Sequence, residues 1–487
     1  MRGQAKPRAN RAMKLEEVPI GAQSMERFLP LLGPERIAEA AKVAVAARQK
    51  LEGRVFWNVN STARGGGVAE MLHSLLAYVR GAGIDARWLV IAGSPDFFRI
   101  TKRLHHALHG SPGDGSPLGD EERAAYERVL QENAEELTGL VSPGDFVLLH
   151  DPQTAGLAPA LTNAGANVIW RCHIGAEQSD PEVERGWDFL GPYLDDVKVT
   201  VFSRHQYIPE CCDHGKSVII PPSIDAFSAK NQALDEPTVR AILVHTGLVE
   251  GPMGEGTPTF HREDGSPARV DRHADVLRMG RAPTWDTPLI VQVSRWDPLK
   301  DPVGVMRGFA QCLDGSAPGG AELVLAGPNV RAIADDPEGA ATFDDVEAAW
   351  RRLPHGERNR VHLACLPMAD VEENAAIVNA LQRHAAIVVQ KSLKEGFGLT
   401  VTEAMWKSRP VVASAVGGIQ DQIENGVHGL LIDDPSDPEA CGRALHRMLD
   451  DPDAAERMGK AAHERVKEEY LGLRHLTQYA ALIKRFD

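Results

Sequence analysis

The chain has 487 residues and a formal net charge of −15, from 53 basic and 68 acidic side chains. This acidic balance argues against a general nucleic-acid-binding protein, which would present a basic face. No apolar run is long enough to span a membrane, and no apolar stretch of the kind found in a secretory signal follows the basic N-terminal residues. The length predicts two or three domains.

The six cysteines are scattered along the chain without a C-x-x-C pair. Several lie within apolar or helical patterns, which is typical of reduced thiols rather than of a disulfide framework. We therefore expect a cytoplasmic protein.

Apolar stretches with the length of buried strands alternate with helical patterns in two successive series. Continuous apolar strands separated by helices indicate parallel sheets that are covered on both faces. We therefore predict an α/β protein with two Rossmann-like, doubly wound domains facing across a cleft. The strands are expected at residues 55–60, 87–91, 146–150, 167–172, 199–202, 218–220, 289–293, 323–326, 361–364, 387–390, 410–414 and 429–432.

The prolines of the segment Pro221-Pro222-Ser223-Ile224-Asp225 stiffen the connection between the two series. We expect a tail and helix over residues 1–50, the first domain over 51–225 and the second over 226–465. The second domain would open with an irregular insert of about residues 230–286. Residues 466–487 are expected to be a helix that could cross back to the first domain.

Small and polar residues follow the first strand of the first domain. Residues 60–67 read Asn-Ser-Thr-Ala-Arg-Gly-Gly-Gly and end where a helix begins. Gly66 and Gly67 would let a phosphate or an acceptor sugar approach the backbone. The spacing is not G-x-G-x-x-G, so a dinucleotide fingerprint is weak, and a flexible turn without a ligand is the alternative.

Two further strands of the first domain end in polar residues. His150-Asp151-Pro152-Gln153 follows one strand, and Arg171-Cys172-His173 ends the next. Ligands of doubly wound domains bind at the carboxyl ends of strands. Asp151 could therefore accept hydrogen bonds from acceptor hydroxyls, and His173 could contact a donor sugar. A histidine with a purely structural role is the equal alternative.

The first strand of the second domain is followed by a loop with two cations, Arg295 and Lys300. Two cations before a helix are suited to binding a diphosphate and to offsetting the charge that builds on a leaving group. The alternative is a pair of surface salt bridges to Asp297 and Asp301.

Residues 394–403 (Lys-Glu-Gly-Phe-Gly-Leu-Thr-Val-Thr-Glu) follow a buried strand and lead into a helix expected at 400–408. The start of that helix presents unpaired backbone N–H groups that favour a phosphate. Gly396 and Gly398 would let the phosphate approach the backbone.

Glu395 and Glu403 flank this glycine turn. Carboxylates repel a phosphate but accept hydrogen bonds from hydroxyl groups. A ligand that carries both phosphates and hydroxyls, such as a nucleotide-sugar, meets both demands. The alternative is a plain strand-to-helix connection with two solvated glutamates.

Other chemistries find less support in the sequence. His105 and His109 are four residues apart on a helix, and Cys211-Cys212-Asp213-His214 groups soft ligands, but neither has the spacing of a zinc site. A serine hydrolase is disfavoured because G-x-S-x-G is absent. Glu395 and Glu403 could be read as a glycosidase pair, but the nearby cations favour a leaving group that is already a phosphate. We expect no metal site.

Taken together, these motifs resemble family-4 retaining glycosyltransferases of the GT-B fold, from about residue 50 to the end. Residues 395–403 match the E-x7-E element of that family, and Arg295 with Lys300 matches its diphosphate-binding loop. The segments Gly417-Gly418-Ile419 and 424–429 (Glu-Asn-Gly-Val-His-Gly) resemble its later signatures.

Within that family, the chain is similar to the trehalose glycosyltransferring synthases and to the retaining trehalose phosphorylases. The similarity lies in residues 57–62, 65–70, 150–153, 170–175 and 221–225. It implies a reversible reaction in which an NDP-glucose and glucose give α,α-trehalose and NDP.

The resemblance also assigns roles to individual residues. The implied donor contacts are Glu403 with the ribose, Glu395 with the glucosyl hydroxyls, Gly398, Leu399 and Thr400 with the phosphates, Arg295 and Lys300 with the diphosphate, and His173 with the donor glucose. Asp151 would orient the acceptor, and Asn60, Gly396 and Phe397 would be further sugar contacts, with Gly66 and Gly67 near the donor.

The family's mechanism is front-face substitution, in which the departing phosphate takes the proton of the incoming hydroxyl. No tightly bound cofactor is implied, Mg2+ is possible but not implied by the sequence, and the base of the donor (ADP, UDP or GDP) stays open. The expected partners are NDP-glucose, glucose and trehalose, without nucleic acid or membrane, and a homodimer stays open. The alternatives are a trehalose phosphorylase, a family-4 transferase with another acceptor, and a catalytically silent nucleotide-sugar-binding protein.

Overall fold

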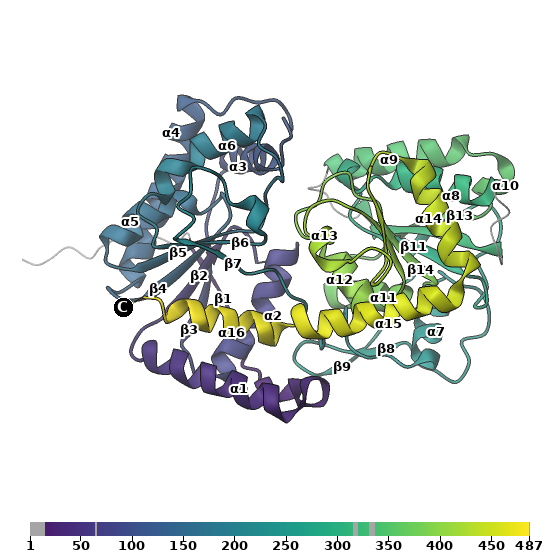
Figure 1. Cartoon of the computed structure of the whole chain (residues 1–487), viewed down its shortest axis with the longest axis horizontal. Coiled ribbons are helices and arrows are strands. Elements are labelled where there is room, and N and C mark those ends of the chain that lie inside the picture. The colour runs from purple at the N-terminus through teal and green to yellow at the C-terminus, as the bar shows by residue number, and fades with distance from the viewer. Residues whose placement is uncertain (1–14, 64–65, 315–319, 331–336, 487) are drawn as a thin grey trace, which may run out of the picture. The chain divides into compact units, whose positions relative to one another are not determined.

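The computed structural model describes residues 15–63, 66–314, 320–330 and 337–486. The chain divides into two compact units (Figure 1). One holds the described residues up to Ile220 together with those from Leu476 onward, and the other is Pro221–His475. Both are doubly wound α/β units, so the predicted fold class is confirmed. Gly65, which belongs to the glycine run, lies outside the described residues.

The first unit is built on a sheet of seven described strands in the order β1-β3-β2-β4-β5-β6-β7. All neighbouring strands are parallel except β1, which runs antiparallel to β3. The strands are β1 (Glu16–Val18), β2 (Phe56–Asn60), β3 (Ala86–Val90), β4 (Phe146–His150), β5 (Asn167–Cys172), β6 (Val199–Phe202) and β7 (Ser217–Ile219).

Helices cover both faces of this sheet, because alternate strand residues face opposite ways and are apolar on both sides. Phe56 packs in one cluster with residues of α2 and of the C-terminal α16, whereas Trp57 packs in another with residues of α3, α4 and α6. Figure 1 shows these two helical layers. The helices are α1 (Leu29–Lys50), α2 (Gly67–Gly81), α3 (Pro95–Leu108), α4 (Asp120–Leu140), α5 (Ala158–Asn163), α6 (Pro181–Leu194) and α16 (Gly472–Ile483).

The second unit repeats this plan with the strand order β10-β13-β12-β11-β14-β15-β16, and β10 is the antiparallel edge. A separate two-stranded sheet joins β8 and β9. The strands are β8 (Thr259–His261), β9 (Pro267–Arg269), β10 (Asp275–Leu277), β11 (Leu289–Val293), β12 (Glu322–Pro328), β13 (Val361–Leu366), β14 (Ile387–Gln390), β15 (Val411–Ser414) and β16 (Leu430–Ile432).

The helices of the second unit lie between and around these strands. They are α7 (Glu236–His245), the 3-10 turn η4 (Pro298–Lys300), α8 (Pro302–Asp314), α9 (Pro337–Arg352), α10 (His355–Arg358), α11 (Val371–His384), α12 (Leu399–Trp406), α13 (Ile419–Gln422), α14 (Pro438–Asp450) and α15 (Pro452–Glu469). Helix α16 starts in this unit, and its later residues Leu482 and Ile483 are buried in the core of the first.

The N-terminal segment and the insert differ from the sequence-based expectation. Residues 16–18 were expected in a tail and helix but form the edge strand β1, and the insert expected to be irregular contains α7, the β8–β9 hairpin and β10. Each of these strands has three residues, too few for an alternating pattern to be recognised. Their pairing partners, not their own sequences, make them strands.

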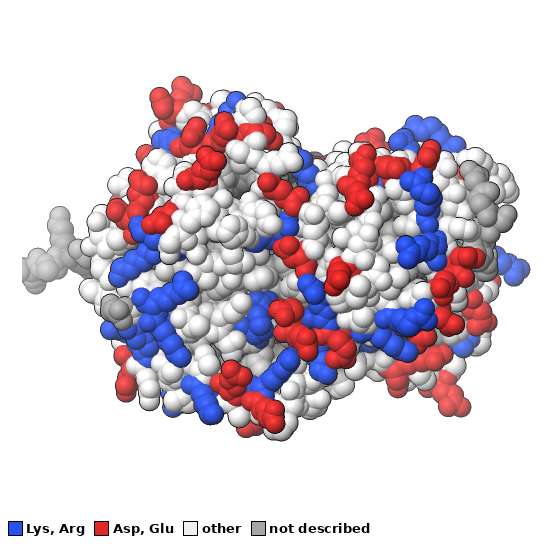
Figure 2. All heavy atoms as spheres, in the orientation of Figure 1, with Lys and Arg blue, Asp and Glu red and all other residues white. Residues whose placement is uncertain are grey.

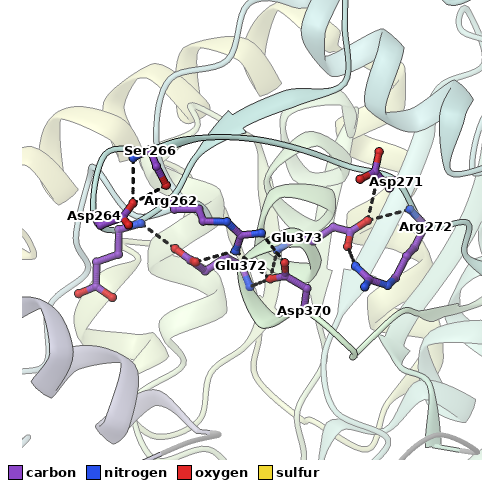
Figure 3. Close-up of polar contacts among 9 residues, drawn as sticks. Arg262, Asp264, Ser266, Asp271, Arg272, Asp370, Glu372 and Glu373 are labelled. Atoms are coloured by element: carbon purple, nitrogen blue, oxygen red, sulfur yellow. Dashed lines mark hydrogen bonds and ion pairs between the residues drawn. The ribbon is translucent and has the colours of Figure 1, made fainter. Parts of the chain in front are cut away.

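The insert is fixed to the start of α11 by ion pairs (Figure 3). The Arg262 guanidinium donates to Asp370 and Glu372, at 2.5 and 2.8 Å for the shorter contact to each. Glu373, which is 1% exposed, accepts hydrogen bonds from the backbone N–H groups of Asp271 and Arg272, both at 2.7 Å. The Arg262 guanidinium holds the pKa of Asp370 down at about 2. We call Arg262, Asp370, Glu372 and Glu373 the clamp. Its contacts hold residues 262–272 against the start of α11.

Charges of both signs are distributed over the surface. Figure 2 shows acidic and basic side chains interspersed on the face drawn, with no extended area of one sign. Within the described ranges, no helix combines the length and the apolar character that a bilayer crossing requires. All six cysteines are free thiols.

Candidate active site

The glycine turn between β14 and α12 has the close-packed backbone that its sequence predicts. Gly398 caps α12 with φ of 84°, a left-handed conformation that a residue with a side chain rarely adopts. A Cβ atom at Gly398 would also lie 2.9 Å from the side chain of Ile419. The Gly418 N–H donates to the Gly396 carbonyl at 3.1 Å. A Cβ atom at Gly418 would lie 2.5 Å from the Phe397 ring, so glycine is required at positions 398 and 418.

A buried glutamine holds the turn in place. Gln422 Nε2 donates to the Phe397 carbonyl at 2.5 Å, and Gln422 Oε1 accepts from the Thr402 hydroxyl at 2.7 Å. The Phe397 ring is 5% exposed and packs edge-on against Tyr470, with ring centroids 5.6 Å apart. Phe397 thus faces the core of the unit. The first helical residues, Leu399 and Thr400, are partly exposed.

Lys300 and Glu395 come together beside this turn. The Lys300 ammonium lies 2.6 Å from Glu395 Oε2, and the two side chains are 17% and 12% exposed. Their loops follow the neighbouring strands β11 and β14, and the Leu393 N–H donates to the Leu299 carbonyl at 2.8 Å. The two charged side chains are therefore adjacent, partly exposed and held on paired loops.

Arg295 lies on the same loop but points into solvent. Its side chain is 72% exposed and forms an ion pair of 3.4 Å with Asp297. Arg295 is thus in the surface pair with Asp297 that the sequence offered as its alternative role. Asp301, the second acidic residue of that alternative, pairs with Lys391 and not with Lys300.

Lys391 is a further part of the site that the sequence did not single out. Its side chain is 1% exposed, and its ammonium donates to Asp301 and to the Pro435 carbonyl, the latter at 2.5 Å. Asp301 has φ of 46° and also accepts from the Gly304 N–H at 2.9 Å. Lys391 therefore fixes the turn that follows Lys300. A lysine at the end of a buried strand was the signal available in the sequence.

Glu403 lies within α12, and its side chain is 8% exposed. Its Oε1 atom is 3.7 Å from the ammonium of Lys230, which belongs to the insert. One helical turn later, the buried Lys407 donates to the Glu403 carbonyl and to Asn231 Oδ1, at 3.1 and 3.0 Å. Burial lowers the pKa of Lys407 to about 7, against the opposing effect of the Glu403 charge. We call residues Lys300, Glu395, Gly396, Gly398 and Glu403 the glycine-turn site.

The first unit gathers its polar side chains at the carboxyl ends of β2, β4 and β5, which are neighbours in the sheet. Asp151 follows β4 with φ of 62°, and its Oδ1 atom accepts from the His173 N–H at 2.7 Å. Burial raises the pKa of Asp151 to about 7, although this hydrogen bond and the charge of Arg171 act in the opposite direction. Asp151 therefore changes its charge near neutral pH.

The His173 ring is hydrogen-bonded through both nitrogens. Nε2 lies 3.0 Å from Nδ1 of His150, and Nδ1 accepts from Nε of Arg171 at 3.2 Å. His150 Nε2 in turn lies 3.2 Å from Asn58 Oδ1. We call Asn58, His150, Asp151, Arg171 and His173 the histidine cluster. The sequence singled out Asp151 and His173 but gave no role to the other three.

The remaining predicted residues of the first unit have structural contacts. Asn60 Oδ1 accepts from the Trp88 indole at 2.8 Å, and Asn60 Nδ2 donates to the Thr62 carbonyl at 2.7 Å. Gly66 caps α2 with φ of 83°, and Gly66 and Gly67 are both exposed. The Asn60 side chain thus holds its own loop, whereas the two glycines leave the start of α2 accessible.

The residues described here include no group of three or more His, Cys, Asp and Glu side chains placed to hold a metal ion. The charged and imidazole groups described above are Arg295, Lys300, Glu395 and Glu403 in the second unit, and Asp151, His150 and His173 in the first.

Comparison with known families identifies both units. Residues 58–209 match the family model described as "Trehalose synthase, N-terminal domain", and residues 371–465 match "Glycosyl transferases group 1". These ranges include the histidine cluster and most of the glycine-turn site.

Among curated relatives, the trehalose synthase of Pyrococcus horikoshii is 34% identical over 96% of this chain and 98% of its own length. That of Thermococcus litoralis is 36% identical over 95% and 97%. The trehalose phosphorylase of Pleurotus pulmonarius is 27% identical, over 87% of this chain but only 55% of its own.

Among solved structures, a trehalose-phosphate synthase from Burkholderia vietnamiensis has a TM-score of 0.64 at 16% identity, covering 89% of this chain and 98% of its own. Identity that low supports the fold alone, which is the GT-B fold of two Rossmann-like domains. The sequence relatives support more, because they match over nearly the whole of both chains. The chain is a retaining hexosyltransferase and belongs to the trehalose synthase family.

Proposed function

We propose that this enzyme transfers glucose from an NDP-glucose to free glucose, giving α,α-trehalose and NDP in a reversible reaction. The observation that carries the proposal is the Lys300–Glu395 ion pair beside the glycine turn. It places a cation and a hydroxyl acceptor side by side, which is what the two halves of a nucleotide-sugar require. The relatives that match over their whole length are trehalose synthases.

In this proposal, Lys300 and Glu395 bind different parts of the donor. Lys300 turns its charge to the diphosphate, and Arg295, which is exposed on the same loop, adds a second cation. Glu395 is then free to accept from hydroxyls of the transferred glucose. The N–H groups at Gly398, Leu399 and Thr400 face the phosphates, and Glu403 accepts from the ribose.

The first unit supplies the acceptor side in this proposal. Asp151, when ionised, accepts a hydrogen bond from the incoming glucose and orients it, and His173 contacts the donor glucose. Gly66 and Gly67 leave backbone room at the start of α2. Further contacts to the sugars are proposed for Asn60, Gly396 and Phe397. Contacts within each unit hold these residues in place.

The chemical step needs no side-chain nucleophile. As the bond from the anomeric carbon to the diphosphate oxygen breaks, negative charge grows on that oxygen, and Lys300 and Arg295 stabilise it. The acceptor hydroxyl attacks from the same face, and its proton passes to the departing phosphate. Anomeric configuration is therefore retained.

The test is an assay of purified protein with glucose and each of ADP-, UDP- and GDP-glucose. The proposal predicts release of NDP together with a non-reducing disaccharide. Breakdown of trehalose that requires orthophosphate and ignores NDP would establish the phosphorylase instead. The relatives favour the synthase, because the trehalose synthases are 34% and 36% identical to this chain and the trehalose phosphorylase is 27% identical. Gel filtration and cell fractionation would test the associated expectations of a homodimer in the cytoplasm.

A further inference from the structure

Arg171 links the histidine cluster to the C-terminal helix α16. It ends β5 with its side chain fully buried. Its three nitrogens point to three different groups: Nε donates to His173 Nδ1 at 3.2 Å, Nη2 to the Ile220 carbonyl at 3.0 Å, and Nη1 to the hydroxyl of Tyr479. The guanidinium carbon also lies 5.6 Å from the centroid of the Tyr479 ring.

The donors of Arg171 allow only one arrangement of protons along the cluster. A guanidinium has no acceptor, so His173 Nδ1 must carry a lone pair. The His173 proton is then on Nε2 and is donated to His150 Nδ1, 3.0 Å away. The His150 proton is in turn on Nε2 and is donated to Asn58 Oδ1 at 3.2 Å. The reverse direction would leave His173 without any proton on either nitrogen.

The same direction accounts for the state of His150. A protonated His150 would be a donor at both nitrogens and would oppose the proton on His173 Nε2. Burial, and after it the charge of Arg171, lower the pKa of His150 to about 3. The neutral ring that the hydrogen bonds require is therefore also the form that burial favours.

His173 is fixed at its backbone as well as at its ring, because its N–H donates to Asp151 Oδ1 at 2.7 Å. We propose that Arg171 and Tyr479 are positioning residues that hold His173 in one orientation as the Nε2–H tautomer. The final helix α16, through the Tyr479 hydroxyl, thereby sets the geometry of the histidine cluster. The catalytic consequence rests on the proposed function, whereas the tautomer does not.

The direct test is the tautomer itself, measured by NMR on ligand-free protein labelled with 15N-histidine. Signals are assigned by their loss in His173→Gln and His150→Asn. Both rings are expected as neutral Nε2–H tautomers in the wild type, and Arg171→Met is expected to convert His173 to a mixture. A wild-type His173 protonated on Nδ1, or a tautomer that Arg171→Met leaves unchanged, would overturn the inference.

The Tyr479→Phe variant tests the role of α16, and it keeps the ring over Arg171 while removing one hydrogen bond. The expected result is a kcat about fivefold lower, with the KM for the donor changed less than twofold. Tyr193→Phe is the matched control, because Tyr193 also lies 5.6 Å from an arginine and accepts from it, and its hydroxyl donates to Glu127, which is not a residue of the cluster. That control should keep the wild-type kcat.

A wild-type kcat in Tyr479→Phe would show that the Tyr479 hydroxyl on α16 does not help to position His173. Equal losses in Tyr479→Phe and Tyr193→Phe would show a general effect on the unit and would contradict the proposal too. If Arg171→Met does not fold, the wild-type tautomer and Tyr479→Phe still decide. If no sugar transfer is found with any donor, the proposed function fails while the NMR result stands on its own.

Discussion

The histidine cluster and the glycine-turn site hold their side chains by opposite means. In the first unit, the buried His150 ring and the partly buried His173 ring are hydrogen-bonded to each other, and Arg171 donates to His173. In the second unit, partly exposed charges are paired within reach of solvent. A network of several hydrogen bonds resists rearrangement, whereas a single ion pair within reach of solvent can exchange partners.

The two sites therefore differ in how far their side chains are already held in place. The histidine cluster is already in one arrangement, so the acceptor would meet a surface that is fixed beforehand. In the proposed reaction, Lys300 and Glu395 bind different parts of the donor, so their ion pair has to open first.

The largest effect is expected from Lys300→Ala. This change removes the cation that faces the growing charge on the diphosphate, and kcat should fall at least about 100-fold with the fold intact. Circular dichroism and steady-state assays measure the two quantities. Arg443→Ala is the control, since Arg443 is 68% exposed in ion pairs on α14 and should keep full activity. A Lys300→Ala variant within threefold of wild type would contradict the assigned role.

A smaller effect is expected from Glu403→Gln, which keeps the shape of the side chain but removes its charge. A hydrogen bond to a charged acceptor is worth more than a neutral one, so the KM for the donor should rise about tenfold with little change in kcat. Titration of donor concentration measures this. The matched control is Glu439→Gln, whose side chain is 71% exposed. An effect on kcat alone would place Glu403 elsewhere in the reaction.

The histidine cluster makes a prediction about pH through Asp151. Its pKa of about 7 means that the carboxyl is mostly neutral below pH 7 and ionised above it. If the carboxylate orients the acceptor, kcat/KM for glucose should rise as pH increases through 7 and level off above it. Profiles from pH 5.5 to 8.5 are compared between wild type and Asp151→Asn. The same rise in Asp151→Asn would assign the titration to another group, such as Lys407.

The smallest effect on activity is expected from the clamp of Figure 3, which lies outside both sites. Glu373→Ala removes the acceptor of two backbone N–H groups and should lower the free energy of unfolding by about 1–3 kcal/mol. Urea denaturation measures that loss, and kcat should stay at the wild-type value. A large loss of kcat in folded protein would show that the insert acts on the glycine-turn site. Lys230 of the insert contacts Glu403 of that site.

Long-range patterns explain why so much of the fold could be predicted. All twelve strands expected from apolar runs are present, with ends that shift by at most two residues, because buried parallel strands are apolar on both faces. The glycine turn could also be predicted from the sequence, because Gly398 adopts a left-handed φ of 84° that favours glycine. The short strands β1 and β10 were missed because their partners alone make them strands.

Residues that act through tertiary contacts could not be found in this way. Lys391, Gln422 and Arg171 have their partners 90, 25 and 308 positions away, at Asp301, Phe397 and Tyr479. Nothing in the local sequence indicates such pairings. Arg295 is the opposite case, because its motif was evident in the sequence but its side chain is exposed and paired with Asp297.

The central claim is that one ion pair divides its two partners between the two halves of the donor. Calorimetric titration of NDP into wild type, Lys300→Ala and Glu395→Gln tests it most directly. We expect that Lys300→Ala weakens NDP binding at least tenfold, whereas Glu395→Gln binds NDP as tightly as wild type or more so but transfers glucose more slowly than wild type. Equal weakening of NDP binding in both variants would contradict it.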